Sequence, residues 1–406
     1  MAPHRIITLL VLAIVLSGCA LGGTPPPEPV TINFAIEDGQ REEYERFLEP
    51  FNKQRPEITV NLQDDRRDDT DCFVDVPFGL PDDVDAGALV ALDPFFDQDT
   101  ELRPDDFYPG AVDVLKYQGK TWGIPAGIDP LVLYYNKEMF DQAGIPYPQS
   151  GWTWDDFLTD AMALSKPDER IFGYAMPQQS QDAFDVALFI YQHGGRLFDD
   201  LSNPTMTTLD DPQTVSAVEW YTDLALRHNV APTPEQMRSF GGGSNQGIGR
   251  GIYESKFGMW LGFFSDRGGR TWPVTWPWPW GMISLPRDET AATAGLVRSY
   301  FILSDRPNPD ACWEFVSFLS TQAPEGLVPA RRSVAESQVF TDLVGAEQAA
   351  AARQAVEEAI LISPEAANAT PALEYLSRAV QEILAGAATP EEALRAAQQQ
   401  AESAAP

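Results

Sequence analysis

The chain after residue 29 opens with a pattern of apolar and polar positions typical of a strand, a helix and a second strand. Residues 30–36 (VTINFAI) and 58–62 are strand-like runs, and residues 41–52 lie between them. The apolar positions of 41–52 recur at helical spacing: Tyr44, Phe47, Leu48 and Phe51. Strand, helix and strand in such a short span predict a βαβ unit and therefore a parallel sheet. A third, short apolar strand is expected at residues 72–76.

Several later helices are marked by their start signals. Thr153 precedes an acidic residue at the third helical position, Asp156, and the two have the form of a capping box. Pro212 and Pro390 stand where the first residue of a helix tolerates proline, because its missing N–H has no helical partner there. We therefore expect helices to begin near residues 153, 212 and 390.

The first residues have the pattern of an export signal rather than of a folded element. Arg5 is followed by an apolar run over residues 6–16, which is too short to span a bilayer. The run ends in Leu-Ser-Gly-Cys, which matches a bacterial lipobox with Cys19 as the lipidated residue. We expect a signal peptide over 1–18 and a lipid-anchored tether over 19–29, rich in Gly and Pro. An ordinary secretory signal with an incidental cysteine is the alternative.

Length and charge narrow the class of protein. The 406 residues suffice for two lobes with cores of their own. A formal net charge of −32 repels phosphate backbones and anionic headgroups, so nucleic-acid binding is not expected. The three cysteines are too few for a disulfide framework and lack zinc-site spacing. We expect Cys72 and Cys312 to be buried free thiols, and no metal or cofactor.

Catalytic motifs are missing, whereas aromatic residues are abundant. Neither a zinc-protease motif nor a nucleophile elbow occurs, and carboxylates are too numerous for any pair to be singled out as a glycosidase dyad. Aromatic residues make up 11% of the chain. Five tryptophans crowd into one short proline-rich stretch: Trp260, Trp272, Trp276, Trp278 and Trp280. Aromatic faces with a few polar groups are typical of small-ligand sites, although each single Trp can equally be a packing residue.

Motifs along nearly the whole chain beyond the tether resemble the family 1 solute-binding proteins of ABC importers, the maltose-binding type. The most specific is residues 119–144, GKTWGIPAGIDPLVLYYNKEMFDQAG. The segments TWDDF (153–157), WGM (280–282) and TPEEAL (389–394) follow in the family's order. The resemblance implies an α/β fold of the two-lobed periplasmic-binding-protein type (type II), with mixed sheets flanked by helices and a hinge between the lobes.

The resemblance also implies where the lobes divide. The chain is expected to cross between them near Asp129, near Trp280 and near Pro307. Residues 30–128 and 281–308 are then the N-terminal lobe. Residues 129–280 and 309–406 are the C-terminal lobe.

The resemblance also implies which residues bind the ligand, from their positions relative to the family's motifs. Asp129 stands where the family has a sugar-binding carboxylate, and a carboxylate there can accept from two sugar hydroxyls. A solvated hinge aspartate is the alternative. Asp38 and Phe78 follow the first and third strands, where polar and aromatic ligand contacts are expected. The family's stacking Trp has no direct counterpart: Phe264 or a displaced Trp260 takes its place.

Further candidates line the same expected cleft. Gln178 can reach hydroxyls from the C-terminal lobe, and Tyr300, near Arg298, lies on a return strand of the N-terminal lobe. Arg331 occupies a cleft-facing family position, where it would suit an acidic sugar or a phosphate. The alternative for Arg331 is an ion pair within an acidic protein.

The resemblance thus implies an extracytoplasmic, membrane-anchored receptor, expected to be a monomer, that delivers a carbohydrate to an ABC permease and its ATPase. The chain itself has neither an ATPase motif nor a transmembrane bundle. Two alternatives stay open: a lipid-anchored glycoside hydrolase that uses two carboxylates, and a receptor of the same fold for a non-sugar polar solute.

Overall fold

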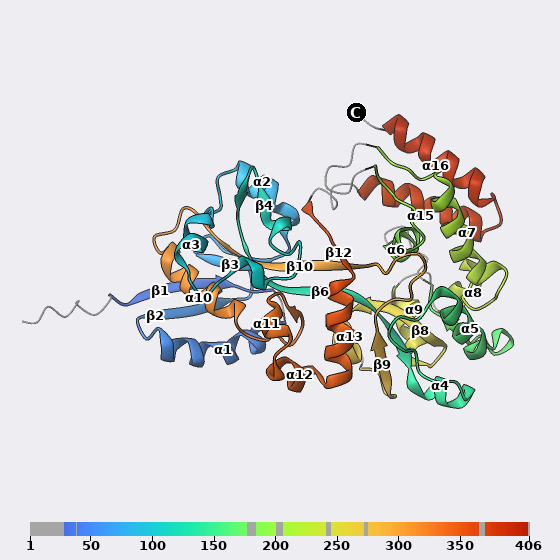
Figure 1. The fold of residues 1–406 in the computed structure, drawn as a ribbon, viewed down its shortest axis with the longest axis horizontal. Coiled ribbons are helices and arrows are strands. Elements are labelled where there is room, and N and C mark those ends of the chain that lie inside the picture. Colours follow the sequence, from blue (N-terminus) through green and yellow to red (C-terminus); the bar gives the residue numbers. More distant parts are fainter. Residues whose placement is uncertain are drawn as a thin grey trace, which may run out of the picture.

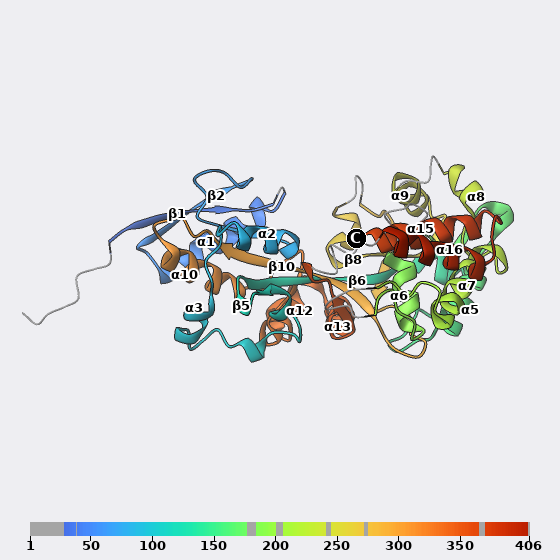
Figure 2. The same ribbon diagram turned by 90° about the horizontal axis from the view of Figure 1, so that it is seen from above.

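The computed structural model describes residues 28–37, 39–176, 184–199, 206–240, 245–271, 275–364 and 370–404. Cys19, the expected signal peptide and nearly all of the tether lie outside these ranges, as do Asp38 and Gln178. Figure 1 shows an elongated molecule in which two lobes lie side by side, and Figure 2 shows the same two lobes from above. In the described part of the chain no helix has the length and apolar character needed to cross a membrane.

The N-terminal lobe contains the predicted βαβ unit. Strand β1 (Val30–Ala35), helix α1 (Arg41–Gln54) and strand β2 (Ile58–Gln63) follow in order, and β1 pairs with β2 in parallel, Val30 opposite Ile58. Strand β3 (Cys72–Asp75) pairs in parallel with the other edge of β1. Tyr44 and Phe51 of α1 are buried. The expected parallel sheet is therefore confirmed.

One mixed sheet runs through both lobes. Its main strand order is β2-β1-β3-β10-β6-β8-β7. The long strand β6 (Ile124–Asn136) is buried at all 13 positions and pairs antiparallel with β10 (Thr293–Ile302) near the first lobe and with β8 (Phe257–Phe263) in the second. Strand β7 (Phe172–Tyr174) pairs in parallel with β8. In both views β6 and β10 connect the lobes.

Shorter elements complete the layers. The remaining strands are β4 (Lys116–Tyr117), β5 (Lys120–Thr121), β9 (Trp280–Ile283), β11 (Val328–Pro329) and β12 (Ala359–Leu361). The remaining helices are α2 (Leu80–Asp85), α3 (Asp93–Gln98), α4 (Lys137–Ala143), α5 (Trp154–Leu164), α6 (Phe184–Gln192), α7 (Pro212–Leu226), α8 (Pro234–Arg238), α9 (Asn245–Tyr253), α10 (Pro309–Ser320), α11 (Arg332–Ala335), α12 (Gln338–Val344), α13 (Ala346–Glu357), α15 (Thr370–Leu384) and α16 (Pro390–Ala404). Two 3-10 turns bear on the site, η1 (Pro77–Gly79) and η5 (Phe264–Gly269).

The predicted helix starts are present. The side chain of Thr153 accepts from the N–H of Asp156, and the carboxylate of Asp156 accepts from the N–H of Thr153, which is the capping box of α5. Helices α7 and α16 begin at Pro212 and Pro390. The local signals therefore located these helices because caps depend on neighbouring residues alone.

Helix α10 corrects the expected division of the chain. Residues 309–406 were assigned to the C-terminal lobe, but α10 packs on α1, β1 and β10 of the N-terminal lobe. Helix α13 packs on β6 and β9 beside the junction, and α15 and α16 pack on α7 in the C-terminal lobe. The chain thus returns to the C-terminal lobe only after β12, because apolar faces of α10 such as Phe315 fill the core beneath β1.

The cysteines correct a second expectation. Cys72 in β3 and Cys312 in α10 form a disulfide, with their Cα atoms 6.1 Å apart. Both residues are almost fully buried, as expected, but they are not free thiols. Their separation of 240 residues along the chain hid the pairing, because only the packing of α10 on the N-terminal lobe brings them together.

A candidate binding site at the junction of the two lobes

The site is built where β6 and β10 pass from one lobe to the other. Asp129 lies in β6 opposite Leu296 of β10, and the segment that follows β8 packs against it. Strand β1 runs toward this junction in Figure 1. Since the carboxyl ends of parallel strands are the usual ligand edge of an α/β sheet, residues that follow β1 and β3 are placed to face it.

Asp129 is buried and accepts two hydrogen bonds from one residue. The N–H of Ser265 donates to Oδ1 at 2.9 Å, and the hydroxyl of Ser265 donates to Oδ2 at 2.7 Å. Asp129 is only 4% exposed. Burial raises the pKa of Asp129 to about 7, although the hydrogen bonds from Ser265 act in the opposite direction. The carboxylate is thus a strong acceptor whose present donors are both neutral.

Phe264 precedes Ser265 in the chain, is fully buried, and has its ring centroid 6.2 Å from that of Phe340. The guanidinium carbon of Arg267 lies 3.7 Å from the centroid of the Phe264 ring. Arg267 also donates to the carbonyl of Phe264 at 2.8 Å and to the carbonyl of Glu325. Burial lowers the pKa of Arg267 to about 10. One face of the Phe264 ring is therefore covered by a side chain three residues away.

The segment that carries these residues also ties the two lobes together. Arg270 forms an ion pair with Glu325 at 2.9 Å, and the N–H of Glu325 donates to Glu43 of α1 at 2.6 Å. Glu325 follows α10 of the N-terminal lobe, whereas Arg267 and Arg270 follow β8 of the C-terminal lobe. The contacts of residues 264–270 therefore extend from Asp129 across the junction.

Phe78, Tyr300 and Trp260 have different surroundings. Phe78 lies in η1 at the carboxyl end of β3 and is 36% exposed, so its ring is available. Tyr300 is buried in the core of the N-terminal lobe against Phe34. Trp260 is 1% exposed and packs on Tyr134, with further ring contacts to Trp276 and Trp278. The structure places Ser265, the neighbour of Phe264 in the chain, on Asp129 and leaves Tyr300 and Trp260 inside the core.

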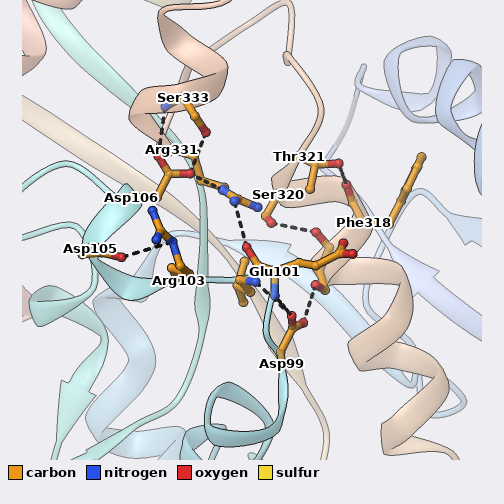
Figure 3. Close-up of polar contacts among 12 residues, drawn as sticks. Asp99, Glu101, Arg103, Asp105, Asp106, Phe318, Ser320, Thr321, Arg331 and Ser333 are labelled. Carbon is orange, nitrogen blue, oxygen red and sulfur yellow. Dashed lines mark hydrogen bonds and ion pairs between the residues drawn. The ribbon is translucent and has the colours of Figure 1, made fainter.

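Arg331 lies in a separate polar cluster of the N-terminal lobe (Figure 3). Its guanidinium forms an ion pair with Asp106 at 2.7 Å and donates to the carbonyl of Glu101 at 3.1 Å. Ser333 donates to the same Asp106 through both its N–H and its hydroxyl, at 3.0 and 2.6 Å. Arg331 lines a cavity of about 550 Å³ between α1, α3 and α10, away from Asp129. These contacts are the ion pair given above as the alternative role of Arg331. Arg298 is likewise paired, with Glu37.

Three residues of the junction escaped the sequence analysis: Ser265, Arg267 and Glu325. No local pattern marks Glu325, because its contacts come from other elements. Arg267 had a signal, since it is a single basic residue between aromatic residues and a Gly-Gly pair. Among the described residues no group of three or more His, Cys, Asp or Glu residues could hold a metal ion.

Two lobes joined by paired strands, with a buried carboxylate and an aromatic ring at the crossing, define a two-lobed α/β binding protein. The family model described as "Bacterial extracellular solute-binding protein" matches residues 37–325, and the chain belongs to this family. Membership confirms the class inferred from the motifs and the expectation of a binding protein rather than an enzyme.

Solved structures and curated relatives agree with this class. The sugar-binding protein MalE of Xanthomonas citri aligns with a TM-score of 0.74 at 18% identity, over 92% of this chain and 97% of that one. A cycloalternan-bound substrate-binding protein of Listeria monocytogenes aligns with a TM-score of 0.71 at 21% identity, over 93% and 99%. These likenesses confirm the predicted two-lobed fold.

Similarity in sequence to curated relatives is partial. An arabinooligosaccharide-binding protein of Halalkalibacterium halodurans is 28% identical over 31% of this chain and 27% of its own length. A mannitol-binding protein of Pseudomonas aeruginosa is 24% identical over 61% of this chain and 56% of its own length. The chain thus matches between about a quarter and a little over half of the length of these relatives.

Proposed function

We propose that the protein is the substrate-binding subunit of an ABC importer and captures a sugar or polyol between its two lobes. The observation that carries this proposal is the buried carboxylate of Asp129 at the strand crossing, which is bound by Ser265, the residue that follows Phe264 in the chain. A carboxylate accepts from ligand hydroxyls, and an aromatic ring stacks on the apolar C–H face of a sugar. The relatives named for an arabinooligosaccharide and for mannitol support the ligand class.

Binding of a polyhydroxylated ligand is tested with the chain begun after Cys19. Isothermal titration against arabino-oligosaccharides, maltotriose and mannitol is expected to give saturable binding with at least one of them. Asp129→Asn is expected to weaken that binding about 10- to 100-fold, because a hydrogen bond to a charged acceptor is replaced by a neutral one. Asp105→Asn, at an exposed carboxylate 3.6 Å from Arg103, is the matched control and should change nothing. Absence of binding to all the probes would count against the proposal.

We further propose that the chain is exported and held at the membrane through a lipid on Cys19. The buried disulfide supports export, since such bonds persist mainly in oxidising compartments. Without a membrane span of its own in the described residues, a receptor is kept near its permease most simply by an acylated tether. Expression with radiolabelled palmitate is expected to label the wild type at the membrane and not Cys19→Ser. Equal membrane retention of both would contradict the anchor.

The disulfide itself carries a prediction. Cys312→Ala is expected to destabilise the protein by about 2–5 kcal/mol, because the crosslink between β3 and α10 is lost. Chemical denaturation followed by tryptophan fluorescence measures the loss. Cys72→Ala combined with Cys312→Ala should cost no more than either single change, since each already removes the same bond. Additive losses would show that the two thiols are not paired.

A further inference from the structure

Resting on the function proposed above, we infer that residues 264–270 occupy the ligand site from within: Ser265 and Arg267 make with Asp129 and Phe264 the contacts that a sugar must take over. The ligand therefore binds in competition with a segment of the protein itself. The residues concerned are Asp129, Phe264, Ser265 and Arg267, with Glu325 as the contact across the junction.

The carboxylate of Asp129 already has two donors. Both oxygens of Asp129 already accept a hydrogen bond, one from the N–H and one from the hydroxyl of Ser265. A sugar hydroxyl is chemically the same donor as the Ser265 hydroxyl, so the two groups seek the same position on Oδ2. An alcohol donor that leaves Asp129 must be replaced at once, because a buried acceptor without a donor is costly. A ligand with hydroxyl groups supplies that replacement, and an apolar ligand does not.

The ring of Phe264 is likewise occupied, by Arg267. The guanidinium of Arg267 lies over Phe264 at 3.7 Å, which is contact distance for a planar group on a ring face. A sugar ring that stacks on this face has to displace the guanidinium. Arg267 is held there by two neutral carbonyls, of Phe264 and Glu325, and makes no ion pair with any described residue. It is therefore held by hydrogen bonds that a small backbone rearrangement can exchange.

The backbone of residues 264–270 contains two glycines that allow it to change conformation. Gly268 and Gly269 both adopt positive φ, of 66° and 81°, and Arg267 departs from helical geometry with φ −43° and ψ 126°. Two adjacent glycines give a backbone that reaches alternative conformations without a Cβ clash. On the side of the N-terminal lobe the segment is fastened by Arg267 and Arg270 to Glu325. Release of the segment from Asp129 thus also loosens the contact across the junction, which couples ligand entry to movement of the lobes.

The test is whether two variants bind the ligand more tightly or more weakly than the wild type does. Ser265→Ala and Arg267→Gln are titrated with the tightest of the probes named above: arabino-oligosaccharide, maltotriose or mannitol. If the segment competes with the ligand, removal of either internal contact is expected to tighten binding about 2- to 10-fold, the range of one hydrogen bond. Ser333→Ala is the matched control, because Ser333 donates to Asp106 through the same two groups at a site away from Asp129. It should leave the dissociation constant unchanged.

The outcomes separate this inference from the function on which it rests. If Asp129→Asn abolishes binding and Ser265→Ala or Arg267→Gln also weakens it, these residues assist the ligand, and the competition is refuted while the function stands. An unchanged dissociation constant in both variants refutes the competition too. If the wild type binds no probe, the proposed function fails and this inference with it. Melting curves of the free variants verify that each is folded before titration.

Discussion

The molecule holds the same pair of residue types twice, at Asp129 with Ser265 and at Asp106 with Ser333. In each pair a serine donates to both carboxylate oxygens through its N–H and its hydroxyl. The difference is the cation: Arg331 lies 2.7 Å from Asp106, whereas among the described residues Asp129 has only neutral donors in direct contact. A hydroxylated ligand can replace a serine that donates to a carboxylate, but not an arginine that forms an ion pair with it. The charge of the existing partner therefore distinguishes a carboxylate that is available to a ligand from one that holds the structure together.

The largest expected loss of stability comes from Arg331→Ala. Asp106 would lose the cation that pairs with it among the described residues, at a site where both side chains are little exposed, 12% and 13%. Breaking a buried pair from one side is expected to cost about 3 kcal/mol, measured by chemical denaturation. Ligand affinity should not change, because the cluster lies apart from Asp129. Arg103→Ala, whose pair with Asp105 is exposed, should cost less than about 0.5 kcal/mol. A loss of ligand affinity in Arg331→Ala would show that Arg331 belongs to the ligand site.

A smaller difference in stability is expected between the variants Asp106→Asn and Asp129→Asn. The first leaves Arg331 buried without a carboxylate and should destabilise the protein by about 2 kcal/mol at pH 7.5. The second removes a desolvated charge that has no direct cation, and should leave stability unchanged or raise it. Denaturation of both variants in the same buffer measures the contrast. Equal losses would mean that the partner's charge does not separate the two sites.

These contrasts also show what the sequence could and could not predict. The βαβ start, the helix caps and the family motifs depend on neighbouring residues, and they led to the right elements and fold. Asp129 was located at the crossing because it lies within the most specific motif. The disulfide, the lobe of α10 and the partners of Arg331 depend on contacts between distant segments, which no local pattern records. Ser265 escaped for the same reason, since its partner is 136 residues away.

The two carboxylates should give opposite responses to pH. Burial raises the pKa of Asp129 to about 7, above its value in the unfolded chain, so its contribution to stability is complete below about pH 4 and is lost as pH rises toward 7. Burial also acts to raise the pKa of Asp106, but hydrogen bonds from Ser333 and the charge of Arg331 lower it below the ordinary value. Its contribution is present above about pH 4 and is lost as the solution becomes more acidic.

Melting temperatures from pH 3 to 8, about one unit apart, test this contrast when each wild-type curve is compared with that of its Asn variant. The difference between wild type and Asp129→Asn should shrink or reverse as pH rises from 4 to 7.5. The difference between wild type and Asp106→Asn should shrink as pH falls below 4. The comparison with each variant cancels the many other carboxylates of this acidic chain. Parallel curves would show that the two aspartates do not differ in their folded pKa.

The smallest expected effect concerns the serines themselves. Ser333→Ala and Ser265→Ala each remove one hydroxyl donor from a carboxylate that is half-buried (Asp106) or buried (Asp129), and each is expected to cost about 1 kcal/mol of stability without ligand. Because Asp106 keeps its ion pair with Arg331, the loss of stability in Ser333→Ala should be the smaller of the two. Saturating ligand separates them further: it should offset the loss in Ser265→Ala, because a ligand hydroxyl takes the vacated position on Asp129, and it should leave the loss in Ser333→Ala as it was. Denaturation of both variants with and without the tightest ligand measures this difference. If the ligand rescues neither, the hydroxyl of Ser265 is not what the ligand replaces.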